Sequence, residues 1–170
     1  VTPDSFSDGG HLLSGDGLLR DGLLERASKM VADGAAILDI GGESTRPGAA
    51  SVSTQEELDR VMGAMELIAP RLDVILSIDT STPEVMREAA QAGAGLLNDV
   101  RALSREGAMA AAIASQLPVS LMHMSDEPDR MQDQTDYADV VTDVKAFLEH
   151  RIAACLEVGI AKDQVMIDPG

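Results

Sequence analysis

The chain has 170 residues, which is enough for one domain with a sizeable hydrophobic core. Its net charge of −16 argues against nucleic acid as a partner, because a phosphate-binding surface needs clustered Lys and Arg side chains. The single cysteine, Cys155, excludes an internal disulfide and a cysteine-based zinc cluster. Neither a secretory signal nor a membrane-spanning segment is visible, so we expect a cytoplasmic protein with no membrane partner.

In chain order, the first regular element expected is a helix over residues 18–33, which follows a polar, glycine-rich loop and ends at Gly34. A strand is expected over residues 36–40. A segment rich in Gly, Pro and Ser then leads to a capping box at residues 54–57, which opens a second helix.

The same strand–helix unit repeats in the second half of the chain. Thr82 as N-cap and Pro83 at the first helical position predict the start of a third helix. Ser104 is expected to cap a short, Ala-rich fourth helix, and a long fifth helix is expected over residues 136–158, with Gly159 at its end. The side chains expected on its core-facing stripe are Tyr137, Val140, Val141, Val144, Phe147, Leu148 and Ile152.

Five short aliphatic runs each end on a polar or soft residue. They are Ile37–Asp39, Ile75–Asp79, Leu96–Asn98, Val119–Met122 and Val165–Asp168. Runs this apolar are typical of parallel strands buried on both faces, and their alternation with helices predicts an α/β fold.

Ligands of α/β barrels and open sheets bind at the carboxyl ends of the strands. We therefore expect the residues at these ends to form one ring of side chains facing one ligand. The residues assigned to the ring are Asp79, Asn98, Met122 and Asp168. A strand that ends on a solvated turn explains any single case, and for Asp39 a cap on the following loop is the preferred interpretation.

Two long motifs and four short ones follow one another in a fixed order. The long motifs are Val1–Gly10 and Gly41–Gly48, and the short ones are Ser77–Thr80, Leu97–Val100, Leu121–Met124 and Ile167–Gly170. Together they resemble the dihydropteroate synthase family of pterin-binding enzymes, and the resemblance runs from the first residue to the last.

The resemblance implies a (β/α)8 TIM barrel that joins 6-hydroxymethyl-7,8-dihydropterin pyrophosphate to p-aminobenzoate and releases pyrophosphate, in folate biosynthesis. It also implies a homodimer and a Mg²⁺ cofactor. The family's metal-binding Asn would precede Val1, so no residue of this chain is assigned to the metal. Since the chain opens in a loop and stops at Gly170 after a strand, we expect residues 1–170 to be a single barrel domain that lacks the first strand and the last βα units.

Four of the strand-end residues suit a pterin ring. Asp168 can accept two parallel hydrogen bonds from the ring's amino group and adjacent N–H. Asn98 both donates and accepts, Asp79 accepts from ring N–H groups, and Met122 offers a polarizable apolar surface. His123 is expected to point away into packing, because neighbours on a strand face opposite sides.

The two long motifs supply the other candidate residues, by resemblance. Phe6 is expected to flank the aminobenzoate, and Asp8 to meet Arg46 when the loops close over the substrates. Arg46 otherwise binds pyrophosphate as a bidentate donor, Thr45 adds a hydroxyl, and Pro47 stiffens the turn. The residues assigned to catalysis are Asp8, Arg46 and Asp79.

Two alternatives stay open. A pterin-dependent methyltransferase acting on a corrinoid protein fits the same strand-end residues, but it needs neither a pyrophosphate site nor an aminobenzoate site. A non-catalytic pterin-binding paralog predicts pterin affinity without turnover.

Overall fold

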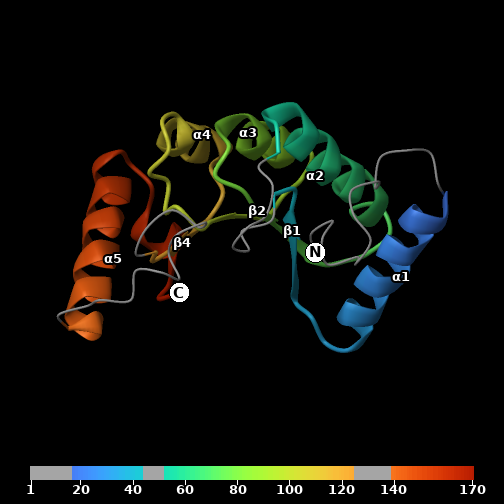
Figure 1. Cartoon of the computed structure of the whole chain (residues 1–170), viewed down its shortest axis with the longest axis horizontal. Coiled ribbons are helices and arrows are strands. Elements are labelled where there is room, and N and C mark those ends of the chain that lie inside the picture. The colour runs from blue at the N-terminus through green and yellow to red at the C-terminus, as the bar shows by residue number, and fades with distance from the viewer. Residues whose placement is uncertain (1–16, 44–51, 125–138) are drawn as a thin grey trace.

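The structure is a computed structural model that describes residues 17–43, 52–124 and 139–170. Helices and strands alternate along these ranges (Figure 1), which confirms the α/β prediction. The elements are α1 (Gly17–Ala32), β1 (Ile37–Gly41), α2 (Thr54–Ile68), β2 (Ile75–Asp79), α3 (Pro83–Gln91), β3 (Leu96–Asp99), α4 (Ala108–Ser115), β4 (Val119–Met122), α5 (Val140–Glu157), a short 3-10 turn η2 (Lys162–Gln164) and β5 (Val165–Asp168).

The five strands form one parallel sheet in the order β1-β2-β3-β4-β5. Strands that are consecutive in the sequence are therefore neighbours in the sheet, as in consecutive units of a (β/α)8 barrel. Each strand coincides with one of the predicted aliphatic runs, although β1 continues past Asp39 to Gly41 and β3 continues past Asn98 to Asp99. Parallel pairing places the carboxyl ends of all five strands at one edge of the sheet.

The hydrophobic core lies between the sheet and the helices that run along one side of it. Figure 1 shows α2, α3 and α4 side by side along the sheet, with α1 and α5 at its two ends. The strand residues buried on this side are Leu38, Ile40, Leu76, Ile78, Leu97, Val119 and Leu121. The same core includes the helix residues Val61, Met65, Ile68, Val85, Met86 and Ala111.

The alternate positions of the same strands face the other side of the sheet. Their side chains are largely polar, and include Asp39, Ser77, Asp79, Asn98 and Ser120. The apolar residues at the amino ends of the first two strands are exposed on this side, Ile75 by 50% of its surface. The prediction of strands buried on both faces is therefore only partly correct: on this face Ser77 and Leu96 are buried, whereas Ile37 and Ile75 are exposed.

The ends of the first three helices agree with the sequence to within a residue or two. Gly34 follows α1 with a left-handed φ of 108°, and Thr82 and Pro83 open α3 as predicted. The N-cap of α2 is Ser53 rather than Thr54, since the Ser53 hydroxyl accepts the N–H of Glu56 at 3.2 Å.

The predicted start of the fourth helix at Ser104 is wrong, because α4 begins at Ala108 with Gly107 as its N-cap. The connection from β3 to α4 contains a turn before Ser104, in which Ala102 and Leu103 have left-handed φ values of 49° and 58°, and Gly107, directly before α4, has a left-handed φ of 83°. Such backbone angles are incompatible with a right-handed helix, so the connection after β3 is longer than the sequence indicates.

The fifth helix begins at Val140, where the Asp139 carboxylate accepts the N–H of Val141. Its first turn projects away from the core, and Val141 is 72% exposed, so the prediction that Val140 and Val141 face the core is wrong. Leu148 is buried as predicted. The start of the predicted helix, residues 136–138, lies outside the described residues.

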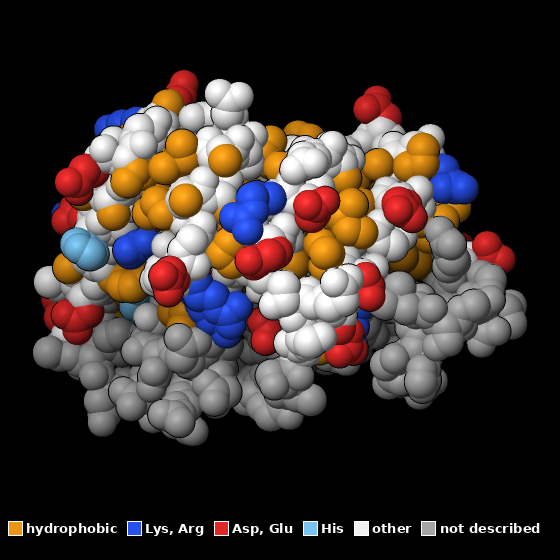
Figure 2. Space-filling model, turned by 90° about the horizontal axis from the view of Figure 1, so that it is seen from above, with side chains coloured by type: hydrophobic (Ala, Val, Ile, Leu, Met, Phe, Trp, Pro, Cys, Tyr) orange, Lys and Arg blue, Asp and Glu red, His pale blue; other side chains and the backbone are white. Residues whose placement is uncertain are grey.

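Figure 2 shows the helix-covered side from above, with acidic, basic and apolar side chains interspersed over the described part of this face rather than gathered by type. Among the helices of the described ranges, none is long and apolar enough to cross a membrane.

Candidate functional site

The carboxyl ends of β2 and β3 bring two of the predicted site residues together. Asp79 and Asn98 are partners in the register of these strands, so their side chains leave the sheet side by side on the face that the helices do not cover. Asp39 of β1 joins them, because the Asn98 Nδ2 donates a hydrogen bond to Asp39 Oδ2 at 3.2 Å. We refer to Asp39, Asp79 and Asn98 as the acid–amide cluster.

The position of Asp39 corrects the sequence-based interpretation. This residue lies in the middle of β1, two residues before the strand ends, and its carboxylate accepts a hydrogen bond from a side chain of β3. The strand continues through Ile40 and ends only at Gly41, so Asp39 is not its last residue. Asp39 therefore belongs to the candidate site from which it was left out.

The environment of Asp79 favours its protonated form. Burial, and then the negative charges of Asp39, Asp99 and Glu57, raise the pKa of Asp79 from 3.8 to about 7. Near neutral pH this carboxyl is therefore present in both protonation states, and it can either donate or accept a hydrogen bond toward a ligand.

The other two strand-end residues form a second pair on the same edge of the sheet. Met122 and Asp168 are register partners on β4 and β5. The Asp168 Oδ1 accepts the N–H of Gly170 at 3.0 Å. One oxygen of this carboxylate therefore bonds to the turn that follows the strand. A carboxylate has further acceptor positions, and Asp168 is exposed, so this bond does not prevent it from binding a ligand.

His123 points away from the site, as predicted. Its ring is buried and meets the ring of Phe147 edge-on, with 5.1 Å between centroids. Its backbone N–H donates to the Asp168 carbonyl oxygen at 2.8 Å, which continues the pairing of the chain after β4 with β5.

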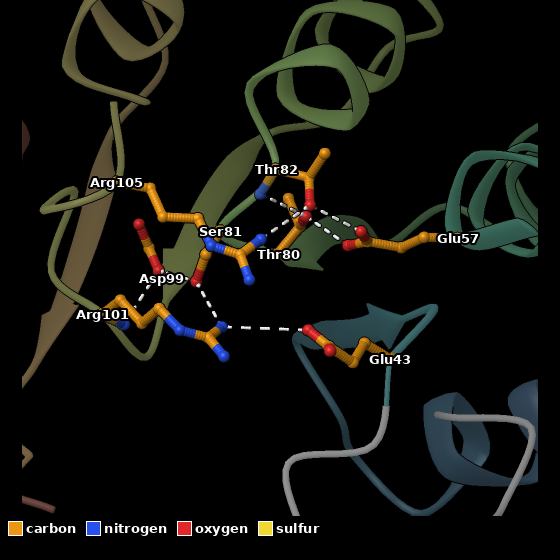
Figure 3. Close-up of polar contacts among 8 residues, drawn as sticks. All are labelled: Glu43, Glu57, Thr80, Ser81, Thr82, Asp99, Arg101 and Arg105. Carbon is orange, nitrogen blue, oxygen red and sulfur yellow. Dashed lines mark hydrogen bonds and ion pairs between the residues drawn. The ribbon is translucent and has the colours of Figure 1, made fainter. Parts of the chain in front are cut away.

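A second polar cluster, which the sequence did not predict, joins the ends of β1, β2 and β3 to α2 (Figure 3). The residues in it are Glu43, Glu57, Thr80, Ser81, Thr82, Asp99, Arg101 and Arg105. Glu57 is only 3% exposed and accepts the hydroxyls of Thr80 and Thr82, the latter at 2.6 Å. The Thr82 hydroxyl is thus bonded to Glu57, and α3 has no side-chain cap although Thr82 is its N-cap residue.

Asp99 anchors the turn that follows β3. Its buried carboxylate accepts the Ser81 hydroxyl and the backbone N–H groups of Arg101 and Leu103, at 2.8 and 2.9 Å. Burial raises the pKa of Asp99, while these hydrogen bonds and the Arg101 charge oppose the rise. Because Asp99 directly follows Asn98, the anchored turn also fixes the strand end that carries the amide of the acid–amide cluster.

Arg101 connects this turn to the other two strand ends. Its Nη1 donates to Ser81 Oγ at 3.1 Å and lies 3.8 Å from Glu43 Oε2 (Figure 3). The chain after β1 is also packed against α2, where Arg60 Nη1 donates to the Gly42 carbonyl oxygen at 2.9 Å. The start of the second long motif, up to Glu43, is therefore held against the loops after β2 and β3.

Comparisons with known proteins place the chain in a family. The family description "Pterin binding enzyme" matches residues 1–170. The chain belongs to the pterin-binding enzyme family. It is 51% identical over 170 residues to dihydropteroate synthase of Escherichia coli K12, covering 100% of this chain and 58% of the relative. It is 47% identical over 169 residues to dihydropteroate synthase of Haemophilus influenzae, covering 99% of this chain and 60% of the relative.

Solved structures of the family have the same fold. A dihydropteroate synthase of Yersinia pestis in a sulfonamide drug complex aligns with a TM-score of 0.90 at 51% identity, over 100% of this chain and 60% of that one. The enzyme of Burkholderia cenocepacia complexed with 7,8-dihydropteroate gives a TM-score of 0.81 at 49% identity, over 89% of this chain and 54% of that one. This chain thus spans about three-fifths of the length of the curated relatives named above.

Several residues that the family resemblance assigns to the site are not covered by the structure. Phe6, Asp8, Thr45, Arg46 and Pro47 all lie outside the described residues. Within the described ranges, no group of three or more His, Cys, Asp or Glu side chains is arranged to hold a metal ion. Magnesium therefore stays a prediction from the resemblance, without a residue of this chain assigned to it.

The position of Glu57 in α2 is the one signal in the sequence that pointed to the second polar cluster. Glu57 lies one helical turn before Val61 and two before Met65, on the stripe that faces the core. A charged residue on a core-facing stripe needs a buried partner, so its spacing was a usable signal. The partners themselves, Thr80 and Thr82, are 23 and 25 residues away in sequence and no local pattern relates them to Glu57.

Proposed function

We propose that the full-length protein is a dihydropteroate synthase. It condenses 6-hydroxymethyl-7,8-dihydropterin pyrophosphate with p-aminobenzoate to give 7,8-dihydropteroate and pyrophosphate, in folate biosynthesis. The observation that carries the proposal is the acid–amide cluster, in which Asp79 and Asn98 stand side by side at the carboxyl ends of adjacent parallel strands and Asp39 bonds to Asn98. The identity of 51% to an enzyme of that name supports the same conclusion.

The donors and acceptors of this edge suit a pterin ring. Asn98 presents an amide to the ring edge on which an acceptor nitrogen lies beside an amino group. Asp168 accepts from that amino group and the next ring N–H, and Asp79 accepts from a ring N–H on the other side. Met122, which is half-buried beside Asp168 in the sheet register, packs on the flat face of the ring.

The acidic character of the site suits the reaction. The bond from the pterin methylene carbon to the pyrophosphate oxygen breaks, and pyrophosphate leaves with the electron pair. The amine nitrogen of p-aminobenzoate then forms a bond to that carbon and loses a proton. Positive charge develops on the pterin as pyrophosphate departs, and the negative charge of Asp39, together with that of Asp79 in its ionised form, stabilises it.

The residues of the two long motifs complete the proposal. Arg46 and Thr45 bind pyrophosphate, Pro47 stiffens their turn, Phe6 flanks the aminobenzoate, and Asp8 pairs with Arg46 over the bound substrates. A Mg²⁺ ion that assists pyrophosphate, a homodimer and a cytoplasmic location belong to the same proposal and rest on the family resemblance.

The assay that tests this function uses the full-length protein, pterin pyrophosphate and labelled p-aminobenzoate. We expect labelled dihydropteroate and one pyrophosphate per product, and no product when free hydroxymethylpterin replaces the pyrophosphate ester. A parallel reaction offers a methylated pterin and a corrinoid protein. Methyl transfer there, with no labelled dihydropteroate, would favour the methyltransferase alternative, and pterin binding without either product would favour the non-catalytic paralog.

A further inference from the structure

We propose that Asp39 is a positioning residue that fixes which end of the Asn98 amide serves as donor and which as acceptor, and so sets the ring edge that the site accepts. The inference rests on the proposed function, because it concerns the recognition of the pterin ring at the same site. The other residues of the site lie at strand ends, and Asp39, in the middle of β1, would help to determine which ring the site binds.

The bond between Asp39 and Asn98 crosses the strand that lies between them. Asp39 is in register with Ser77 of β2, whereas Asn98 is in register with Asp79, two residues further along that strand. Strands two apart in a flat sheet are about 10 Å apart. A separation of 3.2 Å between Asn98 Nδ2 and Asp39 Oδ2 therefore requires that this face of the sheet be concave. Asp39 lies further from the carboxyl ends of the strands than Asn98 does.

This contact determines the orientation of the amide. A carboxylate only accepts hydrogen bonds, and an amide has two N–H donors at one end and a carbonyl oxygen at the other. Turning the Asn98 amide over would bring its oxygen against Asp39 Oδ2 and would replace a charge-assisted bond with a repulsion. The second N–H and the carbonyl oxygen of Asn98 are thus presented to a ligand in one fixed order.

A fixed order discriminates between ligands of the same shape. A pterin has a ring-nitrogen acceptor beside an amino donor on this edge. In the corresponding lumazine an oxygen acceptor replaces the amino group and the ring nitrogen carries a hydrogen, so donor and acceptor are exchanged. Binding lumazine through Asn98 requires the amide to turn over, which breaks the bond to Asp39 and costs about tenfold or more in affinity.

The test is the ratio of affinities for 6-hydroxymethylpterin and 6-hydroxymethyllumazine, measured by calorimetry on the full-length protein. The key variant is Asp39→Asn, which keeps the size and polarity of the side chain but can face Asn98 with either its oxygen or its nitrogen. We expect Asp39→Asn to lower the pterin-to-lumazine ratio about tenfold. A matched control on the same face of the sheet, Ser120→Ala, should leave the ratio unchanged.

A double-mutant cycle identifies the route of the effect. If Asp39 acts through the Asn98 amide, Asp39→Asn changes the ratio in the wild-type background and has no effect on it when Asn98→Ala is already present. An equal change in both backgrounds would mean that Asp39 acts on the ligand directly or through the charge of Asp79, and would overturn the inference.

The outcomes separate this inference from the proposed function. A wild-type protein that binds neither ring would overturn both. A wild-type protein that prefers pterin, together with an Asp39→Asn variant of unchanged preference, would overturn the role of Asp39 and leave the synthase proposal in place. Since the variant is close in shape to the original residue, its folding is checked by the thermal unfolding midpoint in the same samples.

Discussion

At the scale of single residues, Asp79 lies in the candidate site, and its ionisation lowers the stability of the folded protein. Burial of the Asp79 carboxyl, and then the negative charges of Asp39, Asp99 and Glu57, raise its pKa from 3.8 to about 7. The folded protein therefore binds this proton more tightly than the unfolded chain does. As pH rises from about 4 through 7 the proton is lost, and the free energy of unfolding decreases.

The Asp79→Asn variant tests this effect. It removes the ionisable group, so we expect it to gain stability over the wild type as pH rises from 5 to 8, by a few kcal/mol at most. The same change should weaken pterin binding. Urea unfolding of the full-length wild type and variant at pH 5 and pH 8 gives the comparison, and an equal stability difference at both pH values would show that the pKa of Asp79 is not raised.

Asp168 gives a second prediction at the residue scale. The Asp168→Asn variant keeps an oxygen for the N–H of Gly170 but turns one acceptor toward the pterin into a donor that faces another donor. We expect pterin affinity to fall at least about tenfold, which corresponds to the loss of one charge-assisted hydrogen bond. Asp163→Asn, an exposed change of the same kind in η2, is the control. Calorimetry showing equal affinity for both variants would remove Asp168 from the site.

The strand-end residues were predictable because local sequence determines them. A buried parallel strand is an aliphatic run, and the residue after it reaches the ligand edge, which is how Asp79 and Asn98 were found together. Asp39 was misassigned because the run stops before the strand does. Glu57 was missed because its partners Thr80 and Thr82 are distant in the sequence, and the bond of Asp99 to Ser81 likewise exists only in the fold.

At the scale of elements, the strands and the helices α1 to α3 follow from periodicity and caps, while the connection from β3 to α4 does not. Two successive residues of that turn, Ala102 and Leu103, are left-handed, although neither is Gly, Asn or Asp. Asp99 accepts two backbone N–H groups there, and Arg151 of α5 donates to the Ala102 carbonyl oxygen at 2.8 Å. Tertiary bonds, rather than local preference, hold this turn.

The Asp99→Ala variant should therefore destabilise the protein strongly. It leaves the Ser81 hydroxyl and two backbone N–H groups without their buried acceptor, and we expect a loss of about 3 kcal/mol or more in the free energy of unfolding. Asp73→Ala, at an exposed position before β2, is the matched control. Chemical denaturation of both variants provides the comparison, and a loss below about 1 kcal/mol for Asp99→Ala would contradict the role of this turn.

A pair of glycines tests how tightly the loop after β1 packs on α2. A Cβ atom at Gly42 would lie 2.7 Å from the Glu57 carbonyl oxygen and 2.8 Å from its Cγ, so Gly42→Ala should cost about 1–3 kcal/mol. At Gly22 in α1 a Cβ atom would meet nothing within 4 Å, so Gly22→Ala should stabilise the helix by roughly 0.5–1 kcal/mol. Melting temperatures that move in the same direction would contradict this contrast.

At the scale of the whole molecule, one face of the sheet is packed and the other exposes apolar strand residues. Ile37, Ile75 and Met166 are exposed on the polar face, and Ile167 is exposed on the other face of β5. Large exposed aliphatic side chains on strands promote association. Residues 1–170 expressed alone should therefore aggregate and form no dihydropteroate, which size-exclusion chromatography and the labelled assay can check. A monomer with a sharp thermal transition and measurable turnover would contradict this expectation.

The most direct test of the account is a crystal structure of the full-length protein with 6-hydroxymethylpterin bound. We predict that the ring lies on the concave face of the sheet, with its nitrogen atoms about 2.6–3.2 Å from the side chains of Asp79, Asn98 and Asp168. Asp39 should remain bonded to Asn98 and make no contact with the ring. A pterin bound away from the carboxyl ends of β2 and β3, with the acid–amide cluster unoccupied, would contradict the account.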